Sequence, residues 1–181
     1  MSVDSVCDLT MEELELLEGC INKERLKQKR LYYKYCDAMF TLAYRILNDR
    51  DEANDVLQDA FIQVFQKIDQ FRRQSSLGAW IKTIVVRTAI KHFKSIKIFD
   101  TYQQDKHDTF NFSTNEIDGK ILEKVILSLP DGCRTIFILA EVEGYKHREI
   151  AEILNISEGT SKSQLFNAKR ILKLKLKNEY L

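Results

Sequence analysis

Apolar residues recur every three or four positions along most of the chain, which is the spacing of one buried face of a helix. The clearest run predicts a helix over residues 22–47. Its buried side holds Leu31, Tyr35, Met39, Leu42 and Ile46. The buried residues of the further predicted helices are Leu57, Phe61, Val64, Phe65 and Ile68; Trp80, Ile81, Ile84, Val85, Thr88 and Ala89; Ile117, Ile121, Val125 and Leu129; Ile136, Phe137, Leu139 and Ala140; Ile150, Ala151 and Leu154; and Leu165, Ala168, Leu172 and Leu176. Six glycines and one proline are too few for a turn-rich all-β fold. We therefore predict an all-α protein.

Short polar residues mark the expected helix starts. Thr10 and Glu13 have the spacing of a capping box, which predicts a short helix that stops near Gly19. Residues 113–116 give the same signal before a helix that ends at Pro130. The side chains expected to cap other helices are Asp51, Ser76, Asp131 and Ser157.

A polar segment interrupts the helical pattern. Residues 100–115 have no helical period, and we interpret them as a flexible linker. The chain is thus predicted to consist of two small helical domains, residues 1–99 and residues 116–181.

Residues 145–172 have the pattern of two helices with a tight corner at 154–157, the length expected of a helix-turn-helix. Ala151 would let the two helices approach closely. The second helix begins with small, polar and basic residues and has its apolar residues on one side. A recognition helix places such an N-terminal end in the major groove of DNA. A structural hairpin with a solvated basic face is the alternative.

Several side chains of this second helix have the chemistry of DNA contacts. Gln164 and Asn167 suit the edge of adenine. Lys162, Lys169 and Arg170 suit phosphate groups. The sequence therefore favours double-stranded DNA as a ligand of this segment.

The net charge is only +1, but the charges are unevenly distributed. Residues 1–20 contain six acids and no base, whereas residues 81–99 contain five bases and no acid. This asymmetry favours separate partners for separate surfaces, with solvated helix faces as the alternative.

The sequence argues against chemistry at a metal or cofactor. Its four cysteines form no C-x-x-C pair and no histidine lies near them at ligand spacing, so neither a zinc site nor a cofactor is expected. No nucleophile–base set or glycine-rich phosphate loop is visible, so an enzyme is disfavoured. Without a signal peptide or an apolar run of about 20 residues, we expect a cytoplasmic protein with no membrane insertion.

Two stretches resemble one family. Residues 129–172 resemble the C-terminal promoter-binding domain of bacterial sigma factors of the extracytoplasmic-function (ECF) type, and residues 44–95 resemble the other domain of that family. The C-terminal match rests on Leu129, Pro130, Arg134, Phe137, Glu143, Gly144, residues 149–154, Gly159, Thr160, Lys162, Ser163, Leu165 and residues 168–170. The two stretches together cover most of the chain, in the family's order.

The resemblance implies an initiation factor that binds core RNA polymerase, directs it to promoters and helps to open the DNA. It implies contacts with the beta-prime clamp helices, with the beta subunit as a further neighbour. The residues implied to bind polymerase are Asp51, Glu52, Asp55, Gln58 and Asp59. Their role would be charge complementarity. Simple helix capping, the alternative, accounts only for Asp51 and Glu52.

The resemblance also implies two DNA-binding sets. The residues implied for the opened minus-ten strand are Arg72, Arg73, Gln74, Ser75, Ser76, Lys82, Arg87, Lys91 and Lys94. The residues implied for minus-thirty-five duplex DNA are Arg148, Thr160, Ser161, Lys162, Ser163, Gln164, Asn167, Lys169 and Arg170. Trp80 is expected in the core rather than as a stacking platform. Many relatives are held inactive by an anti-sigma protein, a rearrangement that a flexible linker would permit.

Some positions depart from the family pattern and leave the promoter sequence unpredicted. They are Thr88, Lys91, Lys146, Ser161 and Gln164. Two other classes stay open at this point. One is a stand-alone helix-turn-helix regulator that acts as a dimer on a palindromic site. The other is an interaction protein that uses its acidic helix and does not bind DNA.

Overall fold

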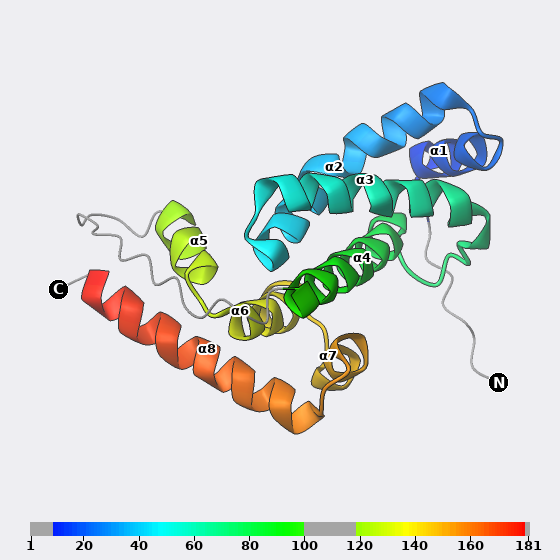
Figure 1. Cartoon of the computed structure of the whole chain (residues 1–181). Coiled ribbons are helices and arrows are strands. Elements are labelled where there is room, and N and C mark those ends of the chain that lie inside the picture. The colour runs from blue at the N-terminus through cyan, green and yellow to red at the C-terminus, as the bar shows by residue number, and fades with distance from the viewer. Residues whose placement is uncertain (1–8, 100–118, 180–181) are drawn as a thin grey trace. The chain divides into compact units, whose positions relative to one another are not determined.

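The computed structural model describes residues 9–99 and 119–179, and within these ranges the regular structure is helical, with no strand (Figure 1). The all-α prediction is confirmed. The chain separates into two compact units, one up to Phe93 and one from Lys94 onward. The predicted linker at 100–115, the predicted cap at 113–116 and Ile117 lie outside the described residues.

The N-terminal unit contains four α-helices and a short 3-10 turn. The helices are α1 (Met11–Ile21), α2 (Arg25–Leu47), α3 (Arg50–Lys67) and α4 (Leu77–Phe99), and the turn covers Ile68–Gln70. Helix α1 packs on α2, and α2 packs on α3. The predicted apolar faces supply much of the core, including the fully buried Leu31, Ile46, Val64, Ile81 and Val85. Val56 and Leu77, which were not predicted, are also fully buried.

The predicted capping box at the start of α1 is present. The Thr10 hydroxyl accepts the Glu13 N–H at 3.2 Å, and the Glu13 carboxylate accepts the Thr10 N–H at 3.1 Å. This N–H bond is the main cause that lowers the pKa of Glu13. Helix α1 ends at Ile21, two residues after the predicted end near Gly19.

Gly19 is needed for packing rather than for ending the helix. A Cβ atom at Gly19 would overlap the side chain of Lys27 on α2, so the glycine lets the two helices approach closely. The chain instead turns at Lys23, which has a left-handed φ of 59°.

Asp49, and not Asp51 as predicted, caps α3. Its Oδ1 accepts the N–H of Asp51 at 2.9 Å and the N–H of Glu52 at 3.0 Å. Asn48 adopts a left-handed conformation at the end of α2, so a single residue reverses the chain and α3 begins earlier than expected. The cap predicted at Ser76 is confirmed, because the Ala79 N–H donates to its hydroxyl at 3.2 Å.

The C-terminal unit is built around its last helix. It contains α5 (Gly119–Leu127), α6 (Asp131–Phe137), a π-helical turn at Ile138–Val142, α7 (His147–Leu154) and α8 (Glu158–Glu179). Helix α8 packs against α5, α6 and α7. The buried residues contributed to this core include Val125, Leu129, Ile136, Leu139, Ile150, Leu165, Ala168 and Leu172.

The cap predicted at Asp131 is wrong. Asp131 is already the first residue of α6, and Pro130 occupies the capping position with φ −52° and ψ 140°. Proline fits there because its missing N–H removes a donor that would lack a partner at the helix start. The carboxylate of Asp131 instead accepts from the buried guanidinium of Arg134, at 2.8 Å.

Thr135 gives a stability prediction. Its side-chain oxygen is buried and has no hydrogen-bond partner among the described residues. Replacing Thr135 with valine keeps the shape and removes an unsatisfied polar group, so the free energy of unfolding should rise by about 1 kcal/mol. Denaturant unfolding followed by circular dichroism measures this change.

Thr88 provides the matched control. Its hydroxyl donates to the Ile84 carbonyl at 2.8 Å and accepts from Gln63 at 3.0 Å. The same substitution at Thr88 removes both bonds and should not stabilise the protein. A Thr135→Val protein no more stable than the parent would contradict the prediction.

Candidate nucleic-acid and protein interfaces

Helices α7 and α8 form the predicted helix-turn-helix corner. Asn155 ends α7 in a left-handed conformation, and the Ile156 N–H donates to the Ala151 carbonyl at 3.0 Å. Ser157 then caps α8, since its hydroxyl accepts the Thr160 N–H at 2.9 Å. The nearly buried Ala151 leaves room for this tight junction. The corner fixes the direction in which α8 begins.

The buried register of α8 decides which of its side chains are available to a ligand. Ser161, Leu165, Ala168 and Leu172 face the core of the unit. At 100° per residue the opposite face carries Ser163, Phe166 and Arg170, with Lys162 at its edge, and all four are exposed. These four residues are called the outer face of α8 below.

Phe166 is the surface residue that the sequence prediction missed. Its side chain is 69% exposed, whereas Leu165 and Leu172 of the same helix are buried. The signal was present in the sequence, because Phe166 directly follows Leu165 and falls outside the i, i+3, i+4 register of the core.

Two residues predicted to contact DNA point into the unit instead. Ser161 is 0% exposed, and its hydroxyl lies 2.8 Å from Nδ1 of His147 on α7. Gln164 is half-buried, and its Oε1 accepts from the Cys133 thiol on α6 at 2.9 Å. Burial raises the pKa of Cys133, which keeps the thiol protonated as a donor. Ser161 and Gln164 therefore join α8 to α7 and α6.

The remaining predicted residues of this set stay on the surface. Arg148 pairs with Glu152 at 3.3 Å, Lys162 with Glu158 at 3.8 Å, and Lys169 with Glu141 at 2.8 Å. Exposed ion pairs of this kind are weak, so the bases can exchange a carboxylate for a phosphate. Other members that keep some exposure are Thr160, Ser163, Asn167 and Arg170.

On α3, four of the five predicted polymerase-binding residues form one exposed stripe. The residues of this α3 stripe are Asp51, Asp55, Gln58 and Asp59. Helical spacing adds Ile62 to the same side, and its side chain is 54% exposed. Glu52 lies at the edge of the stripe, three residues before Asp55, and its carboxylate pairs with His92 of α4. The stripe thus combines carboxylates with one apolar residue that the sequence prediction missed.

The minus-ten set divides between a loop and α4. Arg72 and Gln74 are exposed in the loop before α4, and Arg73 holds a left-handed φ of 58°. Ser75 donates to the Ser76 carbonyl at 3.3 Å. The side chain of Ser76 caps α4, so the polar side chains of this loop that are available to a ligand come mainly from the other loop residues.

On α4, three of the four predicted bases share one face. Arg87, Lys91 and Lys94 are exposed at i, i+4 and i+7. Lys82 is less exposed and projects from the opposite side of the helix, because nine residues separate it from Lys91. It therefore does not extend the basic stripe that the other three form.

Trp80 matches its core prediction only in part. Its ring packs against Phe71 with centroids 5.5 Å apart, but the residue is only half-buried. Helical spacing puts it on the side of α4 that carries Arg87 and Lys91. An aromatic ring and two bases therefore lie along one face.

The helix-turn-helix and the second helical unit define the class as a two-unit DNA-binding protein of transcription. The family model of sigma-70 region 2 matches residues 31–97, and the model of sigma-70 region 4 matches residues 119–172. The chain belongs to the bacterial sigma factors of the ECF type, the subunits that direct RNA polymerase to promoters.

Individual relatives agree with this assignment. The ECF RNA polymerase sigma factor SigW of Bacillus subtilis is 28% identical, over 80% of this chain and 86% of SigW. The RNA polymerase sigma-H factor of Pseudomonas aeruginosa is 26% identical, over 91% of this chain and 94% of that factor. The sigma factor RpoE of Bartonella quintana, solved with the anti-sigma factor NepR, shares the fold with a TM-score of 0.53. It is 24% identical and aligns with 82% of this chain and 96% of its own.

The described residues contain neither a membrane-spanning helix nor a cluster of metal ligands. No helix in residues 9–99 and 119–179 is long and apolar enough to cross a bilayer. The same residues contain no group of three His, Cys, Asp or Glu side chains that could hold a metal ion.

Proposed function

We propose that the α3 stripe is the surface by which this sigma factor binds core RNA polymerase, at the beta-prime clamp helices. The observation that carries the proposal is the exposed row Asp51, Asp55, Gln58 and Asp59 beside Ile62. Carboxylates attract a basic partner during association, and an apolar side chain supplies contact area that is removed from water on binding. Glu52 supports α3 through His92 rather than binding polymerase.

We propose that the outer face of α8 reads duplex DNA at the minus-thirty-five element. Arg170 offers the planar donor fork that suits guanine, and Lys162 offers a charge for phosphate. Phe166 offers an apolar contact for a thymine methyl group. Because Ser161 and Gln164 are hydrogen-bonded to other helices, the residues of the outer face are the ones that contact the bases.

We propose that the loop before α4 and the exposed face of α4 hold the opened minus-ten strand. Arg72 and Gln74 supply polar groups for an unstacked base. Arg87, Lys91 and Lys94 supply a track for phosphates, and Trp80 lies on the same side. The functional domains proposed for these roles are residues 1–99 and 116–181.

The factor has no catalytic activity of its own, because polymerase supplies the chemistry. It acts in the cytoplasm, where its DNA is found. An anti-sigma protein is a proposed partner, since the structurally similar RpoE was solved with one.

Run-off transcription tests the function. Purified core polymerase is given a panel of promoter templates with and without this protein, and transcripts should appear only in its presence. Phe166→Ala with Arg170→Ala should then lower promoter binding by about tenfold or more, since each lost base contact is worth about 1–3 kcal/mol. The same variant should bind core polymerase as the parent does.

Leu174→Ala is the matched control for this variant. It removes an exposed apolar side chain from the same side of α8, one turn past Arg170 and outside the four residues of the outer face, and should leave promoter binding unchanged. Duplex binding without any polymerase binding would instead favour a stand-alone helix-turn-helix regulator. Transcription that does not respond to the double variant would contradict the role of the outer face.

A further inference from the structure

The outward side of α2 carries large apolar residues that no described element covers. Leu26 is 76% exposed and Tyr33 is 64% exposed, and seven residues separate them, so they lie on one side of the helix. Lys29 lies between them, with its Nζ 5.8 Å from the centre of the Tyr33 ring. Leu26, Lys29 and Tyr33, with Arg25 beside them, are called the α2 patch below.

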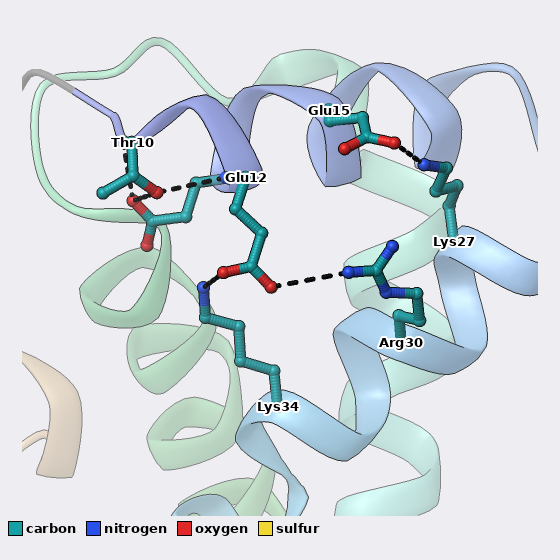
Figure 2. Close-up of polar contacts among 7 residues, drawn as sticks. Thr10, Glu12, Glu15, Lys27, Arg30 and Lys34 are labelled. Atoms are coloured by element: carbon teal, nitrogen blue, oxygen red, sulfur yellow. Dashed lines mark hydrogen bonds and ion pairs between the residues drawn. The ribbon is translucent and has the colours of Figure 1, made fainter.

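On the adjoining flank, the bases of α2 pair with carboxylates of α1. Glu15 of α1 pairs with Lys27, and Glu12 lies 3.7 Å from Arg30 and 3.6 Å from Lys34 (Figure 2). The apolar residues Leu16 and Leu17 of α1 are buried. Helix α1 is therefore an acidic amphipathic helix seated on α2.

The α2 patch keeps its positive charge. The first ten residues of α2 include five bases and no acid. Helix α1 neutralises three of them, whereas Arg25 and Lys29 pair with no carboxylate among the described residues. The positive end of the helix dipole lies at the same end of α2, and the Glu24 side chain makes no capping bond there. A negatively charged partner would relieve this repulsion.

We propose that the α2 patch is a docking site for an acidic amphipathic helix of a partner protein. Leucine-like side chains of the partner would cover Leu26 and Tyr33, and its carboxylates would pair with Arg25 and Lys29. The partner would thus repeat on one flank of α2 the arrangement that α1 makes on the other. This site does not rest on the polymerase or promoter contacts proposed above.

The test uses the full chain and a fluorescent synthetic peptide. The peptide is a helix of about 20 residues with leucines at i, i+3, i+4 and i+7 and glutamates elsewhere. Anisotropy should show saturable binding that weakens with salt. Leu26→Ser with Lys29→Glu should weaken it by about tenfold or more, because the pair removes both an apolar anchor and a charge.

Two controls make the result specific. Leu174→Ser with Lys173→Glu applies the same pair of changes to exposed residues of α8 and should bind the peptide as the parent does. A peptide with lysines in place of the glutamates should not bind. Circular dichroism on both variants checks that their helix content matches that of the parent.

Several outcomes would overturn the proposal. They are no saturable binding, equal weakening by both double variants, or equal binding of the lysine peptide. Co-sedimentation with phosphatidylglycerol vesicles, lost in Leu26→Ser with Lys29→Glu while the peptide fails to bind, would assign the patch to an anionic membrane surface instead. Polymerase is absent from these assays, so their failure leaves the sigma-factor function untouched.

Discussion

Arg134→Met should lower the free energy of unfolding of the C-terminal unit by about 2–4 kcal/mol. Arg134 is 2% exposed, which is unusual for an arginine. Its guanidinium donates to the Leu129 carbonyl at 3.1 Å and to the Leu127 carbonyl at 3.4 Å, at the end of α5. It also donates to Asp131 at 2.8 Å.

Methionine fills much of the arginine's volume but offers no donor to these acceptors. The two carbonyls lose their partner in a buried corner, and each such loss costs about 1–3 kcal/mol. Losing the bond to Asp131 costs less stability, because the Asp131 side chain is partly exposed and can hydrogen-bond to water instead. Arg134→Lys should not restore stability, since a single ammonium cannot reproduce the planar fork.

The two units allow an internal comparison. Trp80, the single tryptophan, lies in the N-terminal unit, whereas both units contribute to far-ultraviolet circular dichroism. In urea unfolding, Arg134→Met should move part of the circular dichroism transition to lower urea while the Trp80 fluorescence transition stays in place. Arg148→Met is the matched control, because that arginine is exposed and should change stability by less than about 0.5 kcal/mol. A fluorescence transition that moves together with the dichroism would contradict an effect confined to the C-terminal unit.

Asp55→Lys with Asp59→Lys should weaken binding to core RNA polymerase by about tenfold to a hundredfold, which is about 1.4–2.7 kcal/mol. Both aspartates are exposed on the α3 stripe, and reversal turns attraction toward a basic partner into repulsion. Their exposure also means that the fold should tolerate the change. Affinity measured with labelled core polymerase at two salt concentrations should show the larger loss at low salt, where charges are least screened.

Glu18→Lys with Asp69→Lys is the control for this prediction. It makes the same change in net charge at exposed residues of α1 and of the 3-10 turn that are not members of the α3 stripe. We expect its polymerase affinity to stay within about twofold of the parent, the change expected from long-range charge alone. Equal losses in the two variants would mean that net charge, and not the stripe, determines the affinity. An unchanged affinity for Asp55→Lys with Asp59→Lys would remove α3 from the proposed interface.

The sequence by itself determined the fold class and most of the helices. Apolar spacing of three and four residues is imposed by helix geometry, so the core faces of α2, α3 and α8 could be read directly. The capping box at Thr10 and the caps at Ser76 and Ser157 were also predictable, because each bond joins residues close together in the chain. The helix-turn-helix pattern and the resemblance to sigma factors followed from the same local information.

Only the tertiary structure decided which polar residues are free to bind a partner. Ser161 and Gln164 have the chemistry of base readers, but His147 and Cys133 from other helices engage them. The predicted caps at Asp51 and Asp131 were wrong, because the conformation of the neighbouring backbone starts each helix a residue or more earlier than predicted. The exposure of the α2 patch became visible only once the packing of α1 and α3 on α2 was known. Burial depends on contacts between distant segments, which local spacing does not specify.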